Sequence, residues 1–259
     1  MWLEPECDTF LHFLHSYAEQ EPQSIGTYRE KSLHAIFKNY ICSDKACQEV
    51  PVGPYVADVL RGDMIFEVQT GSFYPLRDKL RYYLENTSYK VTVVHPMPER
   101  KWLIWIDRDS GEASRKSRSP RRGEPMLLIP ELFWLSDLLP HPRLRVMLYL
   151  ADMEEYRYLD GWGRGGKRGS HRKEMVPLAL TRVYRFADLE DYRAILPALP
   201  DPFTAKAFSS ATKLSGRRLS AALTLYRRLG LIVRGERSKE GYRYSYANEK
   251  EGLPPSVKQ

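Results

Sequence analysis

Two acidic residues lie in otherwise apolar strand patterns on either side of a predicted turn. The segments YVADVL and MIFEVQ have the short apolar runs of buried strands, and the turn between them predicts a hairpin that brings Asp58 and Glu67 together. Glu67 and Gln69 are two residues apart, so both point to one face of their strand. Burying two carboxylates costs free energy unless a cation or another partner neutralises them, and oxygen ligands suit a hard divalent ion. These residues therefore predict a site for Mg²⁺, or for Mn²⁺.

A third acid, Glu30, precedes the hairpin in a segment with helical periodicity. Residues 27–41 are expected to form this helix, because apolar side chains recur in it at three- and four-residue steps. From this helix Glu30 could complete the set of metal ligands. The alternative is that Asp58 and Glu67 are half-exposed strand carboxylates in an unrelated α/β domain.

The order of these elements is similar to that of a known enzyme superfamily. With Glu30 in YREKSLHAIF, Asp58 in YVADVL and Glu67-x-Gln69 in MIFEVQTG, the chain resembles the PD-(D/E)xK nucleases. The resemblance implies an α/β fold of the restriction-endonuclease-like kind, which is a mixed central sheet flanked by helices. It also implies that Asp58, Glu67 and Glu30 bind the metal and belong, with Gln69, to the catalytic set.

The segments that follow the hairpin continue this resemblance, with one departure. A helix is expected over residues 73–85 and two further strands in YKVTVVHP and KWLIWID. Gln69 stands where the superfamily usually has lysine, and glutamine can orient a water by hydrogen bonding but carries no charge. A basic side chain of the following helix, Lys79 or Arg77, could compensate, and Lys79 is assigned to the catalytic set.

The C-terminal part has a different pattern. Residues 205–214 and 217–229 have helical periodicity around a tight turn, and Gly230 is placed to end the second helix. Strand-like runs over 231–233 and 242–246 follow, with a basic turn between them. Two helices joined by a tight turn and followed by a hairpin make a helix-turn-helix with a wing.

This part of the chain resembles the winged helix-turn-helix family. The resemblance implies a small α+β domain whose second helix enters the major groove of double-stranded DNA while the hairpin follows the backbone. The alternative is that this domain is a protein-interaction module. On the first interpretation the DNA-binding residues are Lys213, Ser215, Arg217, Arg218, Ser220, Arg237, Lys239 and Arg243.

The charge distribution supports a polyanionic partner. The formal net charge is +7, and basic residues gather in nearly acid-free runs over 115–122, 164–173 and 217–243. Such runs are expected to contact phosphates, although the first two could instead be solvated loops. The glycines near 160–175 do not open a helix after a strand, which excludes a phosphate-loop nucleotide site.

Other features of the sequence exclude several classes of protein. No apolar run has the length of a membrane span, and the N-terminal residues do not have the pattern of a secretion signal. Cys7, Cys42 and Cys47 lack the number and spacing of a disulfide framework or a zinc site. We therefore expect a cytoplasmic protein without a membrane partner.

These observations predict four regions and one function. The regions are a nuclease-like domain over 1–125, a connecting α/β segment over 126–196, a winged helix over 197–247 and a loose tail over 248–259. The expected function is a Mg²⁺-dependent DNA endonuclease of a mobile-element or phage-defence system, with a homodimer and partner proteins of that system left open. The alternative is a non-catalytic DNA-binding regulator with a degenerate nuclease fold.

Overall fold

The computed structural model describes residues 6–20, 33–107, 110–113, 115–158, 172–239 and 241–247. It divides the chain into two compact units, each built from three separate segments. The first unit comprises Met1–Gly71, Ser88–Glu124 and Val146–Arg185, and the second comprises Ser72–Thr87, Pro125–Arg145 and Phe186–Gln259.

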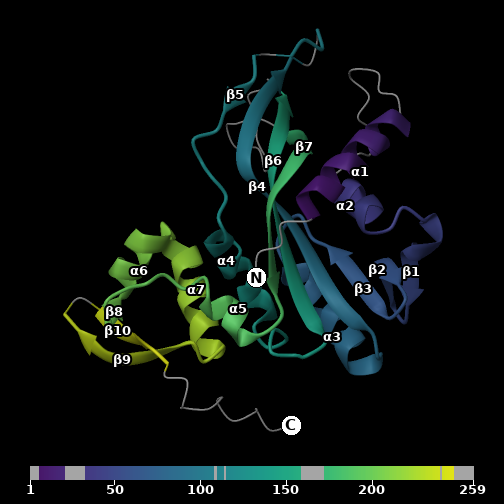
Figure 1. The fold of residues 1–259 in the computed structure, drawn as a ribbon. Coiled ribbons are helices and arrows are strands. Elements are labelled where there is room, and N and C mark those ends of the chain that lie inside the picture. The colour runs from purple at the N-terminus through teal and green to yellow at the C-terminus, as the bar shows by residue number, and fades with distance from the viewer. Residues whose placement is uncertain are drawn as a thin grey trace. The chain divides into compact units, whose positions relative to one another are not determined.

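The first unit is built around a seven-stranded mixed sheet with the order β1-β2-β3-β4-β6-β7, and β5 pairs with β4 (Figure 1). β1, β2 and β3 form an antiparallel meander, and β4 is parallel to β3. The mixed α/β sheet expected from the sequence is therefore confirmed. The strands are β1 (Gln48–Val52), β2 (Tyr55–Arg61), β3 (Met64–Val68), β4 (Lys90–Ile106), β5 (Ser117–Arg118), β6 (Leu144–Tyr158) and β7 (Arg172–Phe186).

The hairpin of β2 and β3 follows directly from its sequence. Gly62 sits in the turn with a φ of 59°, a left-handed conformation that glycine adopts without a steric penalty. Val59 pairs with Phe66 and Arg61 pairs with Met64, so the two strands have the boundaries that the apolar runs predicted, within one residue.

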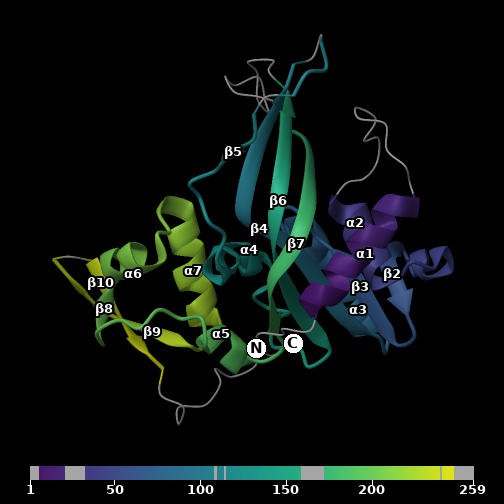
Figure 2. The same cartoon turned by 45° about the horizontal axis from the view of Figure 1, so that its top comes forward.

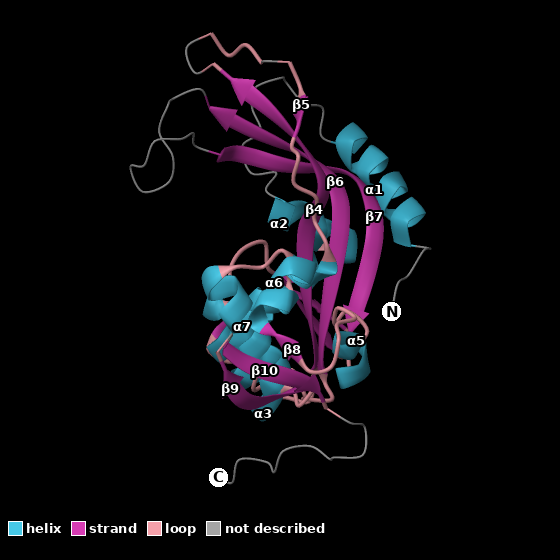
Figure 3. Cartoon of the chain, turned by 90° about the vertical axis from the view of Figure 1, so that its left-hand side faces the viewer, coloured by secondary structure: helices cyan, strands magenta, loops and turns pink. Residues whose placement is uncertain are grey.

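β4 and β7 differ from the expectation. The two strands expected in YKVTVVHP and KWLIWID are a single strand of 17 residues, β4. Pro96 and Pro98 lie beyond Val94, the last residue of β4 that pairs with β3, so they interrupt no bond of that ladder. β7 was not predicted, and most of the basic loop expected to precede it lies outside the described residues. Figure 3 shows β4, β6 and β7 as long neighbouring strands.

Two helices cover one face of this sheet (Figure 2). They are α1 (Glu6–Gln20) and α2 (Leu33–Ile41), and a single-turn 3₁₀ helix, η1 (Lys45–Cys47), leads into β1. Phe10 of α1 and Phe37 of α2 are fully buried with ring centroids 5.2 Å apart, and Phe37 also contacts Tyr149 of β6. The helix expected over residues 27–41 is thus present from Leu33, and residues 27–32 lie outside the described part.

The second unit combines short helices with a three-stranded sheet of order β8-β10-β9. The expected helix over 73–85 is present as η2 (Tyr74–Leu76) and α3 (Arg77–Asn86), and Arg143 fixes its end by donating a hydrogen bond of 2.7 Å to the carbonyl oxygen of Thr87. The other elements are η3 (Pro125–Leu127), α4 (Ile129–Leu132), η4 (Phe133–Leu135), α5 (Leu189–Arg193), β8 (Phe203–Thr204), α6 (Ala205–Thr212), α7 (Gly216–Arg228), β9 (Ile232–Ser238) and β10 (Gly241–Tyr246).

The C-terminal helices confirm the sequence prediction closely. Thr204 caps α6 by accepting a hydrogen bond from the N–H of Ala207, and Gly230 follows α7 with a φ of 69°. The hairpin is longer than expected, because β9 continues through most of the segment taken as a basic turn. β8, which pairs with β10, was not predicted, since two residues leave no periodic signal.

The compact units differ from the regions expected at 1–125, 126–196 and 197–247. The middle region is shared between the units, because β6 and β7 belong to the sheet of β1–β4 while η3 and α4 pack with α7. Within the described ranges, no helix is both long and apolar enough to cross a membrane.

Replacing Phe37 by alanine should lower the free energy of unfolding of the first unit by about 3–5 kcal/mol, because it leaves a cavity in the aromatic cluster. Urea unfolding followed by the fluorescence of Trp102 and Trp105 measures the change. Val56→Ala is the control, since this strand residue is 49% exposed and its truncation should change the stability little. Equal midpoints for the two variants would contradict the assigned core.

Candidate functional site

The two acids that the sequence singled out stand opposite each other in the sheet. The register pairs Val59 with Phe66 and Leu60 with Ile65, and continuing it by one residue sets Asp58 of β2 opposite Glu67 of β3. Residues opposite each other in an antiparallel pair are near neighbours. The hairpin therefore brings the two carboxyl-bearing residues to the same level of the sheet, as expected.

Asp58 is held by two described donors from different elements. Its Oδ2 accepts a hydrogen bond of 2.8 Å from the backbone N–H of Val68 and lies 3.1 Å from Nε2 of His34 on α2. The side chain is 19% exposed. A fixed but accessible carboxylate of this kind is suited to bind a cation.

Glu67 is one of the most deeply buried acids of the chain, with 1% exposure. It lies between Phe66 and Val68 in β3 and pairs with Val93 of β4 in the parallel ladder. Ionisation of a carboxylate at such a depth requires compensation from nearby positive charge or hydrogen-bond donors. Because Glu67 is buried, the ionisation of its carboxyl group depends on the charges and hydrogen-bond donors next to it.

The backbone of Gln69 is fixed on both sides just after β3 ends. Its N–H donates to the carbonyl oxygen of Val94, at 2.8 Å, and its own carbonyl oxygen accepts from Nδ1 of His95. Burial lowers the pKa of His95 to about 4, although the bond to Gln69 opposes the shift. His95 is therefore neutral at pH 7 with its proton on Nδ1, and it anchors the end of β3.

A second polar pair lies on the same helix as His34. Lys38, one turn further along α2, is buried and donates to Glu49 of β1 at 2.8 Å. This hydrogen bond lowers the pKa of Glu49, while the nearby charge of Asp58 opposes the shift. α2 thus supplies two nitrogen-bearing side chains to the acids of β1 and β2, a contribution that the sequence did not reveal.

Two predicted catalytic residues are not placed beside Asp58 and Glu67. Glu30 lies outside the described residues. Lys79 is half-buried on α3 and belongs to the second unit. Among the residues that the structure describes, no three His, Cys, Asp or Glu side chains gather as a metal site.

The predicted DNA-binding residues lie at the surface of the second unit. Ser215 is the N-cap of α7, and Lys213 ends α6 in a left-handed conformation with a φ of 58°. The remaining residues lie on the first turns of α7 and on the β9–β10 hairpin. All eight are exposed: Lys213, Ser215, Arg217, Arg218, Ser220, Arg237, Lys239 and Arg243. Their contact with DNA stays a prediction.

One side of α7 is already engaged within the second unit. Arg218 donates to the carbonyl oxygen of Leu127 at 2.9 Å, and Arg228 donates to Oγ of Ser136 and lies over the ring of Phe133. A groove of about 640 Å³ runs between α7 and the α4 region. Its lining includes Glu131, Phe133, Trp134, Arg217, Arg218 and Ser220. Three predicted DNA-binding residues therefore border this groove.

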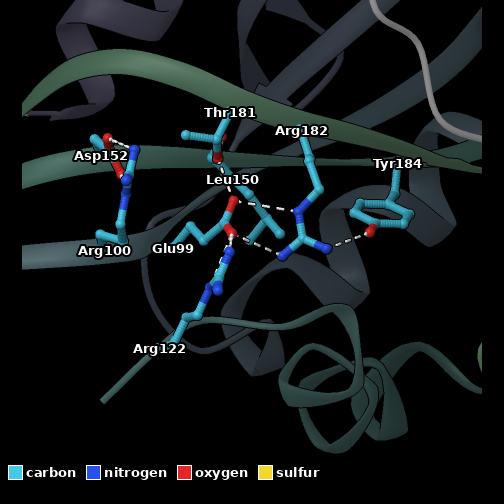
Figure 4. Close-up of polar contacts among 8 residues, drawn as sticks. All are labelled: Glu99, Arg100, Arg122, Leu150, Asp152, Thr181, Arg182 and Tyr184. Atoms are coloured by element: carbon cyan, nitrogen blue, oxygen red, sulfur yellow. Dashed lines mark hydrogen bonds and ion pairs between the residues drawn. The ribbon is translucent and has the colours of Figure 1, made fainter. Parts of the chain in front are cut away.

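A charged cluster that no sequence pattern predicted surrounds Glu99 of β4 in the first unit (Figure 4). Glu99 is 3% exposed and accepts hydrogen bonds from Thr181 and Arg182 of β7 and from Arg122, whose Nε lies 3.0 Å away. Burial opposes ionisation of Glu99, but these three donors outweigh it and hold its pKa at about 2. Glu99 is therefore a stable anion bound by two arginines and one hydroxyl group.

Further ion pairs cross from β4 to β6 beside this cluster. Nε of Arg100 donates a hydrogen bond of 2.7 Å to Asp152, and the two side chains form a bidentate ion pair that Figure 4 also shows. Glu155 is fully buried and binds both Lys101 and Arg157. Buried acids thus orient a set of exposed and half-buried basic side chains along this half of the sheet.

The fold and the sites define an α/β protein with a mixed sheet, to which a small helical unit is joined. Comparison with known proteins matches residues 31–187 to the family described as "Domain of unknown function (DUF8091)". The match covers more than half of the chain, which therefore belongs to this family. An uncharacterized protein of Treponema pallidum (strain Nichols) is 26% identical over 237 residues, covering 88% of this chain and 89% of that protein. No solved structure matches the chain.

Replacing Glu99 by glutamine should destabilise the protein by about 3 kcal/mol at pH 7, because the depressed pKa of Glu99, about 2 against 4.5, reflects that much stabilisation of its ionised form. A depressed carboxyl pKa stabilises the fold above pH 4.5 and loses its effect as the pH falls towards 2. The difference between wild type and variant should therefore shrink over this range. Urea unfolding at pH 7, 4.5 and 3 measures it, with the exposed Glu112→Gln as control. A difference independent of pH would contradict the assignment.

Proposed function

We propose that the protein is a divalent-metal-dependent DNA endonuclease, which hydrolyses phosphodiester bonds at Asp58 and Glu67 and is positioned on duplex DNA by its C-terminal elements. One observation carries the proposal. Asp58 and Glu67 stand opposite each other on adjacent strands, and Glu67 is 1% exposed. A deeply buried acid opposite a second, accessible carboxylate is typical of sites that bind cations.

The order of elements in the chain supports a restriction-endonuclease-like fold. A helix, α2, is followed by the β1-β2-β3 meander, by α3, and by β4, which is parallel to β3. This is the order that the resemblance to PD-(D/E)xK nucleases implies, with Asp58 on the middle strand of the meander and Glu67 near the end of the third. This agreement in order supports Asp58 and Glu67 as the proposed metal ligands.

The donor set fits Mg²⁺ or Mn²⁺. Asp58 and Glu67 offer carboxylate oxygens, the ligands that these hard ions prefer, and Glu30 is the third acid proposed for the set. When bound, the ion would stabilise negative charge on the scissile phosphate. The Val68 N–H and His34 fix the carboxylate of Asp58 in place, which preorganises the site.

Gln69 would orient the attacking water through its side-chain amide. Its backbone is fixed to Val94 and to His95, so the amide projects from a rigid point. Because glutamine lacks the charge of lysine, it cannot stabilise a developing anion as lysine does, and the proposed rate is correspondingly lower. We propose Lys79 as a compensating cation.

The C-terminal elements support a winged helix-turn-helix domain. The helices α6 and α7 are followed by the β9–β10 hairpin, and β8 adds a third strand beside β10. In this arrangement α7 would enter the major groove with Arg217 and Arg218 at its start, and the hairpin residues would follow the backbone. Double-stranded DNA is thus the proposed partner.

A non-catalytic DNA-binding regulator is the second candidate. One observation favours it: Gln69 stands where the PD-(D/E)xK superfamily usually has lysine, and glutamine carries no charge. In this case the first unit would serve as a scaffold and the C-terminal elements alone would carry the function.

Replacing Asp58 by asparagine should lower the rate of plasmid cleavage with Mg²⁺ or Mn²⁺ by at least about 100-fold, because one metal ligand loses its charge. EDTA should abolish cleavage by the wild type. Asp63→Asn is the matched control, since Asp63 is an exposed acid of the same hairpin, bound to Lys90, and its loss should change the rate little. Equal rates for Asp58→Asn and wild type would exclude this site. DNA binding without cleavage by the wild type would establish the regulator.

The double substitution Arg217→Ala and Arg218→Ala should weaken binding to a duplex more than about tenfold at 0.1 M salt, because two phosphate or base contacts are lost. Fluorescence anisotropy with a labelled duplex measures the affinity. Arg227→Ala serves as control, as Arg227 is exposed at the far end of the same helix. Unchanged affinity of the double variant would mean that α7 does not read the groove, and would favour a protein-interaction role.

A further inference from the structure

The basic run 115–122 lies along β4 from Ser117 onward. Ser117 and Arg118 form β5, which pairs with Leu103 and Trp102 of β4, and the N–H of Ser119 donates to the carbonyl oxygen of Lys101 at 2.8 Å. We call residues 117–122 the arginine strap. Figure 3 shows this segment running beside β4. These backbone hydrogen bonds fix the main-chain atoms from which the arginine side chains extend.

Gly123 holds the end of the strap close to β4. Its N–H donates to the carbonyl oxygen of Glu99 at 2.9 Å, and a Cβ at this position would lie 2.0 Å from the carbonyl oxygen of Pro98. Only glycine permits this approach. The strap is therefore seated by backbone contact at both ends.

The strap and Arg100 of β4 border an open cavity of about 350 Å³ that is lined chiefly by arginine. The N–H of Arg121 donates to Oγ of Ser119, which turns the chain at this point. The lining consists of Arg100, Arg118, Ser119, Pro120, Arg121 and Arg122. Four arginine residues thus line one small space.

Two of these arginines are held in place by buried acids. Glu99 binds Arg122, and Asp152 binds Arg100 through both of its carboxylate oxygens. The other two, Arg118 and Arg121, are exposed and form no ion pair with any acid of the described segments. The cavity therefore carries more positive than negative charge, and buried acids fix the orientation of two of its arginines.

We propose that this cavity binds a phosphate group of the DNA backbone, an inference that rests on the proposed function. Guanidinium groups match the oxygens of a phosphate in geometry and charge, and they bind it through paired hydrogen bonds. The hydroxyl of Ser119 adds a neutral donor. Asp152 and Glu99 compensate the charges of Arg100 and Arg122, whereas those of Arg118 and Arg121 are available to an anion.

The place of the cavity in the sheet suits a second contact on the same duplex. Arg100 is seven residues beyond Val93, the partner of Glu67, which corresponds to about 23 Å along β4. Along a duplex this distance spans roughly seven base pairs. A DNA molecule cut at Asp58 and Glu67 would thus reach the arginine strap within one turn of its helix.

The test replaces Arg118 and Arg121 by glutamine in the full chain and measures binding to a 20-base-pair duplex in EDTA, where metal-dependent cleavage is absent. If the cavity neutralises one phosphate, the slope of log affinity against log salt should fall by about 0.9, which amounts to roughly an eightfold weaker affinity at 0.1 M salt. Anisotropy at 50–200 mM salt measures both quantities. Circular dichroism verifies that the variant is folded.

Two control variants make the result specific. Arg118→Lys with Arg121→Lys retains both charges, so it should keep the slope of the wild type. Lys45→Gln removes one exposed charge beside β1, the strand at the far end of the sheet order, and should leave the slope unchanged. A glutamine variant that binds with the slope of the wild type would overturn the proposal.

The same measurements separate this inference from the proposed function. A lower slope for the glutamine variant, together with a wild type that does not cleave in Mg²⁺ or Mn²⁺, would support the phosphate site and reject the nuclease. A wild type that does not bind the duplex at 50 mM salt would overturn both. Cleavage that persists while the slopes are equal would reject the phosphate site alone.

Discussion

The pairing of β4 along one of its edges is the constraint on which both sites depend. Residues 90–94 pair with β3 in parallel and thereby fix Glu67, while residues 102–103 pair with β5 and fix the arginine strap. Backbone groups buried in a sheet must be paired, so loss of either contact would leave N–H and C=O groups along this edge of β4 without their strand partners. Pro96 and Pro98 fall in the interval between the two ladders. One strand thus positions a pair of acids at one end and a group of arginines at the other.

Buried carboxylates have two different roles in this sheet. Around Glu99 the protein itself supplies the cations, Arg122 and Arg182, and the carboxylate is ionised at any physiological pH because its pKa lies near 2. Around Asp58 the described donors are a backbone N–H and His34. The first arrangement satisfies its acid within the fold and orients arginines outward. The second is the site at which we propose an external cation, so the two clusters are assigned different chemistry.

Local patterns predicted the elements that carry local signals. The apolar runs around Asp58 and Glu67, the cap at Thr204 and the glycine at position 230 each fixed a boundary that the structure confirms. Features that depend on distant partners were beyond this reasoning. Glu99 gains its role from Thr181 and Arg182, more than 80 residues away, and the continuity of β4 through two prolines depends on where β3 ends. The position of Glu30 stays a prediction, since it lies outside the described residues.

The division into units bears on how the C-terminal helices are stabilised. Residues 197–247 were expected to be a domain of their own, yet α7 packs with α4, and Tyr226 is fully buried with its hydroxyl directed to Met126. Burial raises the pKa of this phenol far above its usual range, so the hydroxyl remains neutral. A segment that begins at residue 197 would expose this face of α7 to water. The second unit therefore includes residues from three parts of the chain, because α7 completes its core only with η3 and α4.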